Sequence, residues 1–145
     1  MKSKGMSLIE IIILMALMTI VFTLSLKFNT NKIDDFLLQS TGKIIKSYME
    51  LAKEISIKER TPYRVIFDSN ENTITIRERN FNPQIIDHIQ IDNRIRFIGK
   101  EISILDFNSN GHSRYFNVVI ENKNHKQMRI KILPVTNEVK VEDIK

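Results

Sequence analysis

Three histidines and no cysteine set narrow limits on the chemistry that this chain could perform. His88, His112 and His125 lie far apart in the sequence, and no two of them have the four-residue spacing of a helical metal site. The sequence also lacks a nucleophile elbow and a phosphate-binding loop, and it has no thiol for catalysis or for a disulfide. We therefore expect no enzymatic activity, no cofactor and no metal site.

Basic residues two positions apart are the remaining candidates, because they recur in three segments with strand-like patterns. Alternate residues of a strand lie on one face of its sheet, so each pair would present two positive charges on the same side. A few such charges can bind DNA phosphates weakly and without sequence preference. The alternative is that the pairs are the solvated faces of half-buried strands. The candidate DNA contacts are Arg77, Arg79, Arg94, Arg96, Arg129 and Lys131 in the pairs, with Arg114 and Lys126 near turns.

The elements that position these residues follow an apolar run near the start of the chain. From residue 8 to residue 26 there are about 19 residues, which as a helix would cover about 28 Å, close to the roughly 30 Å core of a bilayer. An ordinary secretory signal has a shorter apolar region, of about 7–15 residues, followed by a small-residue cleavage site, and no such site follows Leu26. The run predicts a transmembrane helix over residues 6–27.

Charges at the start of the chain predict how this helix is oriented. Lys2 and Lys4 favour a cytoplasmic amino end, which places the chain from Lys27 onward outside the cell membrane. Glu10 is the one charged residue within the apolar run. Because an ionised carboxylate in a span costs about 2.5–3.5 kcal/mol, we expect Glu10 to have a partner.

The string Gly5-Met6-Ser7-Leu8-Ile9-Glu10, with basic residues before it and an apolar helix after it, resembles the class III signal of type IV pilins and pseudopilins. The resemblance implies that prepilin peptidase, a membrane aspartyl protease, removes the leader 1–5 by cutting between Gly5 and Met6 and then N-methylates Met6. Glu10 matches the family's glutamate at the fifth place of the mature chain. The family most often has phenylalanine where this chain has Met6.

The same resemblance implies a life cycle and a set of partners. Before assembly the chain would be a single-pass protein of the cell membrane, and afterwards part of a filament at the cell surface. Its partners would be other pilin or pseudopilin subunits, which it would contact through the N-terminal helix, and an assembly platform membrane protein. Within the filament, the Met6 amino group of a neighbouring subunit would be the cation that pairs with Glu10, and the chain's own Met6 amine, one helical turn away, could compete for it.

Residues 28–145 are expected to form one exported globular domain, since about 120 residues suffice for a single core. A segment at 27–32 rich in poor helix formers predicts a loosened helix there. An apolar periodicity of 3.6 predicts an amphipathic helix at about 33–58, with Gly42 as a weak point and Pro62 marking the exit. From Tyr63 the period changes to two, which predicts seven or eight short antiparallel strands over about 63–143. The fold class is therefore α+β.

The long helix followed by strands is also similar to the pilin fold, and the last two-thirds resembles the H-type minor pseudopilin domain. The matching residues are Arg96-Phe97 with Gly99, the turn from Asp106-Phe107 to Gly111, the Phe116-Val118-Ile120 strand, and Met128-Ile130-Ile132 leading to Asn137-Glu138-Val139. The family usually has glycine where Asn137 stands, and asparagine is the next-best residue for a left-handed turn.

In a chain this short, the resemblance is closest to the D-type minor pseudopilin of Gram-positive competence systems. It implies a minor pseudopilin of a competence filament that assists DNA uptake in transformation. The alternatives are a minor pilin of a type IV pilus or a pseudopilin of a type II secretion-like system, with no DNA role. A solitary membrane-anchored surface domain and a DNA receptor that does not polymerise are the rivals from other classes.

Overall fold

The computed structural model describes the backbone of residues 8–144 and the side chains of residues 8–24 and 32–144. These residues fall into two compact units, which divide between Ile33 and Asp34. Helix α1 (Leu8–Glu59) supplies the first unit and the opening element of the second. Residues 27–32 are helical, so the predicted loosening was wrong. Asparagine and threonine cost less than about 1 kcal/mol each in a helix, too little to end one.

The first unit is an apolar helical segment whose described side chains, at 8–24, are all exposed. Its two threonines satisfy their hydroxyl groups within the helix. Thr19 Oγ1 donates to the Met15 carbonyl at 2.8 Å, and Thr23 Oγ1 donates to the carbonyls of Thr19 and Ile20 at 3.0 and 2.8 Å. Among the residues that the structure describes, no helix has the length and hydropathy needed to cross a membrane. The span over 6–27 stays a prediction.

The α1 residues of the second unit form the amphipathic helix that the sequence predicted. Leu38, Ile45, Met49 and Ala52 are buried along one side. The helix ends at Glu59, where the next residue, Arg60, has a left-handed φ of 52°. A left-handed residue just after a helix, with proline soon after it, is a common way for helices to stop.

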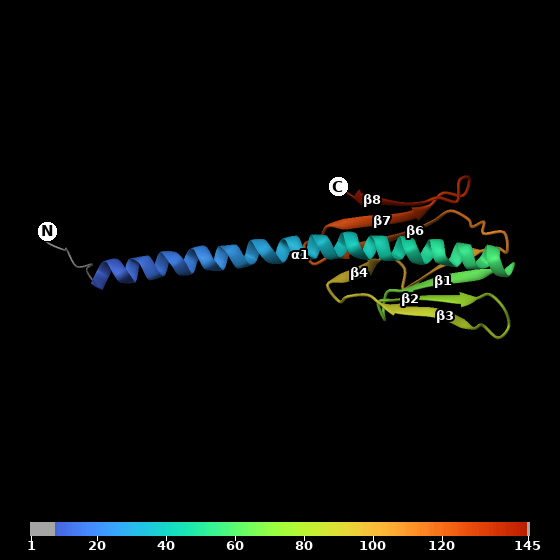
Figure 1. Ribbon diagram of the computed structural model, residues 1–145, viewed down its shortest axis with the longest axis horizontal. Coiled ribbons are helices and arrows are strands. Elements are labelled where there is room, and N and C mark those ends of the chain that lie inside the picture. Colours follow the sequence, from blue (N-terminus) through green and yellow to red (C-terminus); the bar gives the residue numbers. More distant parts are fainter. Residues whose placement is uncertain (1–7, 145) are drawn as a thin grey trace. The chain divides into compact units, whose positions relative to one another are not determined.

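In the described part of the chain, eight antiparallel strands follow and form two four-stranded sheets. The strands are drawn as arrows in Figure 1. The first sheet has the order β3-β2-β1-β5, with β1 (Tyr63–Asp68), β2 (Thr73–Glu78), β3 (Ile85–Gln90) and β5 (Ile102–Phe107). The second has the order β4-β6-β7-β8, with β4 (Ile95–Ile98), β6 (Phe116–Asn122), β7 (Gln127–Ile132) and β8 (Val139–Ile144). The predicted α+β class and strand number are confirmed.

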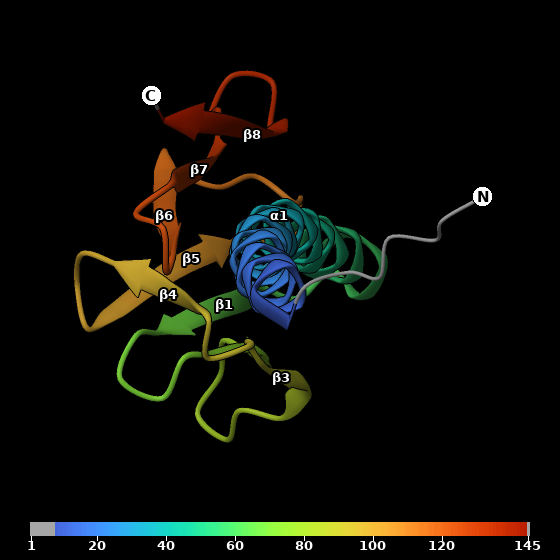
Figure 2. The same ribbon diagram turned by 90° about the vertical axis from the view of Figure 1, so that its left-hand side faces the viewer.

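The sheets exchange strands along the chain, because β4 of the second sheet lies between β3 and β5 of the first. Both sheets pack against the α1 residues of this unit and lie to one side of the helix in Figure 2. Three phenylalanines join the sheets. Phe67 of the first sheet lies 5.9 Å from Phe97 and 5.4 Å from Phe116 of the second, measured between ring centroids. One apolar core therefore serves both sheets.

Gly42 marks the closest approach between α1 and the second sheet. A Cβ atom at this position would lie 2.3 Å from Met128 Sδ on β7 and 3.4 Å from Val141 Cγ1 on β8. Close packing therefore explains why glycine stands at this weak point of the helix, because any side chain there would displace the buried Met128.

Asn137, in the turn between β7 and β8, has a φ of 49°, so it occupies the left-handed region as expected. Its backbone carbonyl accepts a hydrogen bond from Lys53 Nζ of α1 at 3.0 Å, and its side chain contacts His112 Nδ1. Asparagine therefore does more here than tolerate the turn, because it connects the turn to the helix and to the loop after β5.

Candidate functional surfaces

Of the three residues that the sequence predicts to act in processing and assembly, the structure describes Glu10 alone. Gly5 and Met6 lie outside the described residues. Glu10 lies in the first turn of α1 with an exposed side chain.

Strand register places three of the predicted DNA-contact residues on one face of the second sheet. Arg96 lies opposite Glu121 in the β4–β6 pair, and Arg129 lies opposite Glu142 in the β7–β8 pair. Lys131 follows Arg129 by two positions and shares its face. This is the face away from the core, because the residues between them, such as Ile130, are buried.

The other two predicted pairs are not strand pairs. Arg94 precedes β4, and Arg79 follows β2. Asp92 holds Arg94 in a turn, because its carboxylate accepts a hydrogen bond from the Arg94 backbone N–H at 2.9 Å. The Arg79 N–H donates to the Pro62 carbonyl at 2.9 Å, just beyond the last paired residue of β2. The expectation that Arg77 with Arg79 and Arg94 with Arg96 lie along strand faces was wrong for these end residues.

Carboxylates accompany most of the predicted DNA contacts. Ion pairs join Arg79 to Asp106, Arg94 to Asp92, Arg96 to Glu121, Lys126 to Asp35, and Lys131 to Glu142. Within the described part of the chain, Arg77, Arg114 and Arg129 form no such ion pair. The hydrogen bond from Lys131 lowers the pKa of the Glu142 carboxyl, and the nearby charge of Arg129 adds to this effect. A DNA phosphate would have to compete with these carboxylates for most of the positive charge.

Glu121 is the most buried of these carboxylates, with a side chain that is 6% exposed. It accepts hydrogen bonds from Arg96, with Nε at 2.9 Å, and from Gln127 Nε2 at 3.1 Å, and His125 Nδ1 lies 3.4 Å away. The Arg96 hydrogen bonds, together with that from Gln127, lower the pKa of Glu121 to about 2. Arg96 is thereby committed to holding a buried charge.

The free edge of β5 is the second surface that stands out. Ser69 N–H donates to the Glu101 carbonyl at 2.8 Å, in register with the β1–β5 ladder. Because antiparallel bonds alternate, Ile102 and Ile104 direct their N–H and C=O groups away from β1. No strand of the described chain pairs with that side of β5. Ile102 and Ile104 are 52% and 44% exposed.

The first half of β6 presents a second free edge. β4 pairs only with Val119–Asn122, so Phe116–Val118 have no neighbour on that side within the described sheets. β5 and the segment leading to β6 meet at one bridge, between Phe107 and Ser113, and then diverge. The two edges therefore form the sides of an opening that widens away from the bridge.

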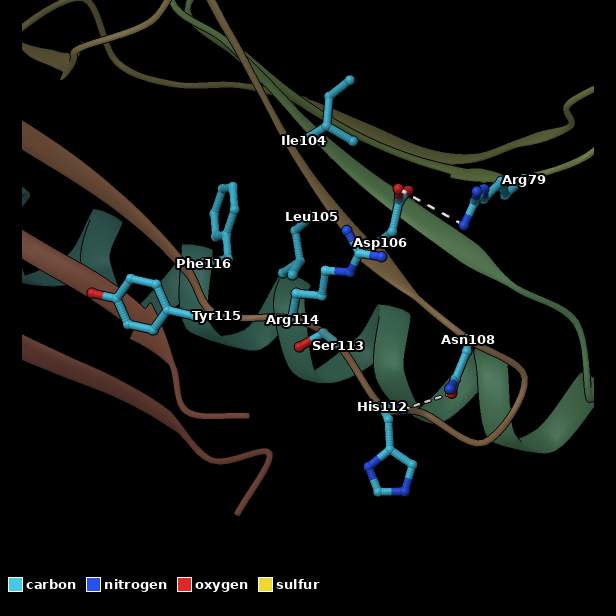
Figure 3. Close-up of a pocket in the computed structure, with 10 residues that line it drawn as sticks. All are labelled: Arg79, Ile104, Leu105, Asp106, Asn108, His112, Ser113, Arg114, Tyr115 and Phe116. Carbon is cyan, nitrogen blue, oxygen red and sulfur yellow. Dashed lines mark hydrogen bonds and ion pairs between the residues drawn. The ribbon is translucent and has the colours of Figure 1, made fainter. Parts of the chain in front are cut away.

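We call this opening the β5/β6 groove. It consists of two adjoining cavities of about 560 and 500 Å³ that share Ile104, Tyr115 and Phe116. Figure 3 shows one end, with Ile104, Leu105 and Asp106 on the β5 wall and Ser113, Arg114, Tyr115 and Phe116 on the other. Gly99 and Lys100 line the opposite end.

Comparison with known proteins gives a match in structure alone. No protein-family model matches the chain, and no curated protein matches its sequence. Two solved structures of the minor pseudopilin EpsH from the type II secretion system of Vibrio cholerae are similar, each with a TM-score of 0.62. Their sequences are 13% and 12% identical to this one. The matched regions cover 73% and 76% of this chain and 96% and 97% of the EpsH chains.

The chain has a pilin-like α+β fold. The fold predicted from the sequence is confirmed, and a minor pseudopilin is among its structural neighbours. The sequence analysis did not identify the β5/β6 groove. One signal was available, because Ile104 and Leu105 are both apolar and adjacent in a strand, whereas a strand with one solvated face normally alternates.

Proposed function

We propose that this chain is a minor pseudopilin of a competence filament that assists DNA uptake across the cell envelope. The observation that carries the proposal is the combination of a pilin-like fold with the apolar helix α1, which contains Glu10 and which a basic leader and the sequence Gly5-Met6 precede. Prepilin peptidase would cut between Gly5 and Met6, and the first unit would hold the precursor in the membrane.

The exposed apolar side chains at 8–24 support an assembly role for the helix. Such a surface is unfavourable in water and requires lipid or other apolar helices around it. Transfer from lipid into a filament would exchange one apolar environment for another, and Glu10 would fix the axial position of the subunit by pairing with the Met6 amino group of a neighbour.

The alternative is a subunit of a type II secretion-like system or of a type IV pilus with no DNA role. EpsH, with which this fold compares, is a component of a type II secretion system. The carboxylates beside most of the basic residues also favour this alternative, because they reduce the charge available to DNA. Deletion of the gene separates the two. Loss of transformation with normal secretion supports the competence role, and the reverse supports the alternative.

Mass spectrometry of the chain from cells that contain prepilin peptidase tests the assembly proposal itself. The expected mature protein begins at N-methylated Met6, and a Gly5→Val variant should keep its leader. A wild-type chain that begins at Met1 in such cells would refute processing and leave a solitary anchored domain as the better interpretation.

Direct DNA contact is tested with the exported domain from Lys32 onward, against duplex and single-stranded DNA over a salt series. If four phosphates are engaged, the slope of log affinity against log salt should be about −3 to −4. Replacing Arg77, Arg114 and Arg129 by alanine should weaken binding more than replacing the ion-paired Arg79, Arg94 and Arg96. Equal losses, or no binding at low salt, would remove the DNA contact from the proposal.

A further inference from the structure

We infer that the β5/β6 groove binds an extended segment of a different polypeptide, which adds to the free edge of β5 as a β-strand and places an acidic side chain beside Arg114. The groove is on the exported domain, which the filament role leaves without an assigned partner. The inference does not depend on which secretion or uptake system the filament serves.

The backbone of β5 is the first part of the argument. Ile102 and Ile104 direct their N–H and C=O groups into the groove, as the alternation fixed by the Ser69–Glu101 hydrogen bond requires. An unpaired strand edge is a template for another strand, and proteins normally cover or charge such edges. Here the edge carries isoleucines instead, so it is suited to pairing.

The side chains that line the groove are the second part. Ile104, Leu105 and Phe116 provide apolar surface along its length. β5 has six residues and so extends about 20 Å, enough to pair with a segment of similar length. In strand addition, main-chain hydrogen bonds provide affinity, and the alternate side chains of the ligand provide specificity through such apolar positions.

Charge at the closed end of the groove is the third part, and it selects the ligand. Asp106 is already engaged by Arg64, with Nε at 2.7 Å, and by Arg79 at 3.9 Å. Arg114 lines the same end, is exposed, and has no ion pair among the described residues. Lys100 adds positive charge at the other end. A segment with a carboxylate near Arg114 therefore complements the groove.

A hydroxyl group at the same end supports a polar ligand. Ser113 Oγ is buried and has no hydrogen-bond partner in the structure. Buried hydroxyls are normally paired, so rotation of the Ser113 side chain towards the groove would let a ligand group satisfy this one. Figure 3 places Ser113 beside Arg114 on the wall opposite β5.

A second copy of this chain fits less well than a separate segment. Its edge strands are β3, β4, β5 and β8, and each of them is already joined to a sheet on its other side. The groove has walls on both sides, formed by β5 and by Tyr115–Val118, so it suits a strand that is free of its own sheet. We therefore assign it to an extended segment of another polypeptide.

The test uses the full chain, purified in a non-ionic detergent, and a display library of random seven-residue peptides. Peptides selected on the wild-type chain are counter-selected on an Ile104→Pro variant. Proline removes only the N–H that points into the groove, so the bonds between β5 and β1 remain and the fold should be retained. Ile104→Ala is the matched control, because it shortens the side chain but keeps the N–H.

We expect the surviving peptides to alternate apolar and polar residues and to carry aspartate or glutamate near one end. They should bind Ile104→Pro at least tenfold more weakly than wild type, and Ile104→Ala within about threefold. Alternate amides of the peptide would face β5, so N-methylation of these amides should abolish binding, whereas N-methylation of the amides between them should not. Equal binding to the proline and alanine variants, or no surviving peptide, would overturn the inference.

A charge exchange keeps the test decisive if the proline variant does not fold. Arg114→Glu should weaken the acidic peptide about three- to tenfold, and replacing the peptide's acid by lysine should restore binding to that variant. Unchanged affinities would refute the placement of the acid. Recovery of peptides that match residues 138–144, with self-association of the purified chain, would overturn the assignment to a different polypeptide.

Discussion

Replacement of Gly42 by alanine tests whether helix propensity or close packing decides this position. In an exposed helix interior the change would stabilise the protein by about 1 kcal/mol. Here the new Cβ would lie 2.3 Å from Met128 Sδ, so the buried methionine would have to move by more than an ångström. Overpacking of this kind costs about 1–3 kcal/mol. We therefore expect a net destabilisation of about 1 kcal/mol.

The sign of the effect should reverse when the methionine is shortened. Met128→Val removes Sδ but retains an atom near Cγ, which would lie 3.7 Å from the new methyl group, an ordinary contact. In that background Gly42→Ala should stabilise the domain by up to about 1 kcal/mol, because only the propensity difference remains. The two backgrounds thus give opposite predictions for one substitution, and their difference measures the contact.

Thermal unfolding of the domain from Asp34 onward measures both effects, since 1 kcal/mol corresponds to a shift of about 4 °C in Tm for a domain of this size. Ser47→Ala, at an exposed position of the same helix, is the control for propensity and should raise stability slightly in both backgrounds. Stabilisation by Gly42→Ala in the wild-type background would refute the packing argument.

Three further predictions concern single side chains. The folded-state pKa of Glu121 is lowered to about 2, so its ion pair contributes stability above pH 4.5 that is lost as the pH falls towards 2. Over this range the Tm of the wild type should converge on that of Glu121→Gln. Parallel curves of Tm against pH would contradict the prediction. Asn137→Ala should be about 1 kcal/mol less stable than Asn137→Gly in denaturant titrations, because alanine is strained at a φ of 49°, and equal stabilities would show that the hydrogen bonds alone matter. Glu10→Ala should leave membrane insertion intact and reduce recovery in sheared filaments, and undiminished incorporation would rule out its assembly role.

The elements of this fold were predictable because their signals are local. The change from a 3.6-residue to a two-residue apolar period at Tyr63 marks the end of the helix, and Pro62 stands at that point. Asn-Gly at 110–111 predicts the turn after β5, where Gly111 has a φ of 76°. The prediction of a loosened helix at 27–32 was wrong, since weak propensities do not interrupt a helix without proline.

The surfaces were less predictable because they depend on contacts between distant residues. The positive charge of Lys126 is offset by Asp35, which is 91 positions earlier in the chain. Arg96 is likewise committed to Glu121 on another strand. The β5/β6 groove depends on how far β4 extends along β6, and a strand's end cannot be located to one residue from sequence alone.

The order of strands along the chain has a consequence for how the domain folds. Because β5 pairs with β1 across the intervening β2, β3 and β4, the first sheet depends on a long-range pairing that spans a strand of the second sheet. The β1–β2 and β6–β7 hairpins are the local units that can form early, whereas the three-phenylalanine junction joins β1, β4 and β6 and so depends on contacts between distant parts of the chain. Because both sheets contribute to one core, folding should be a single cooperative transition and not the separate folding of two sheets.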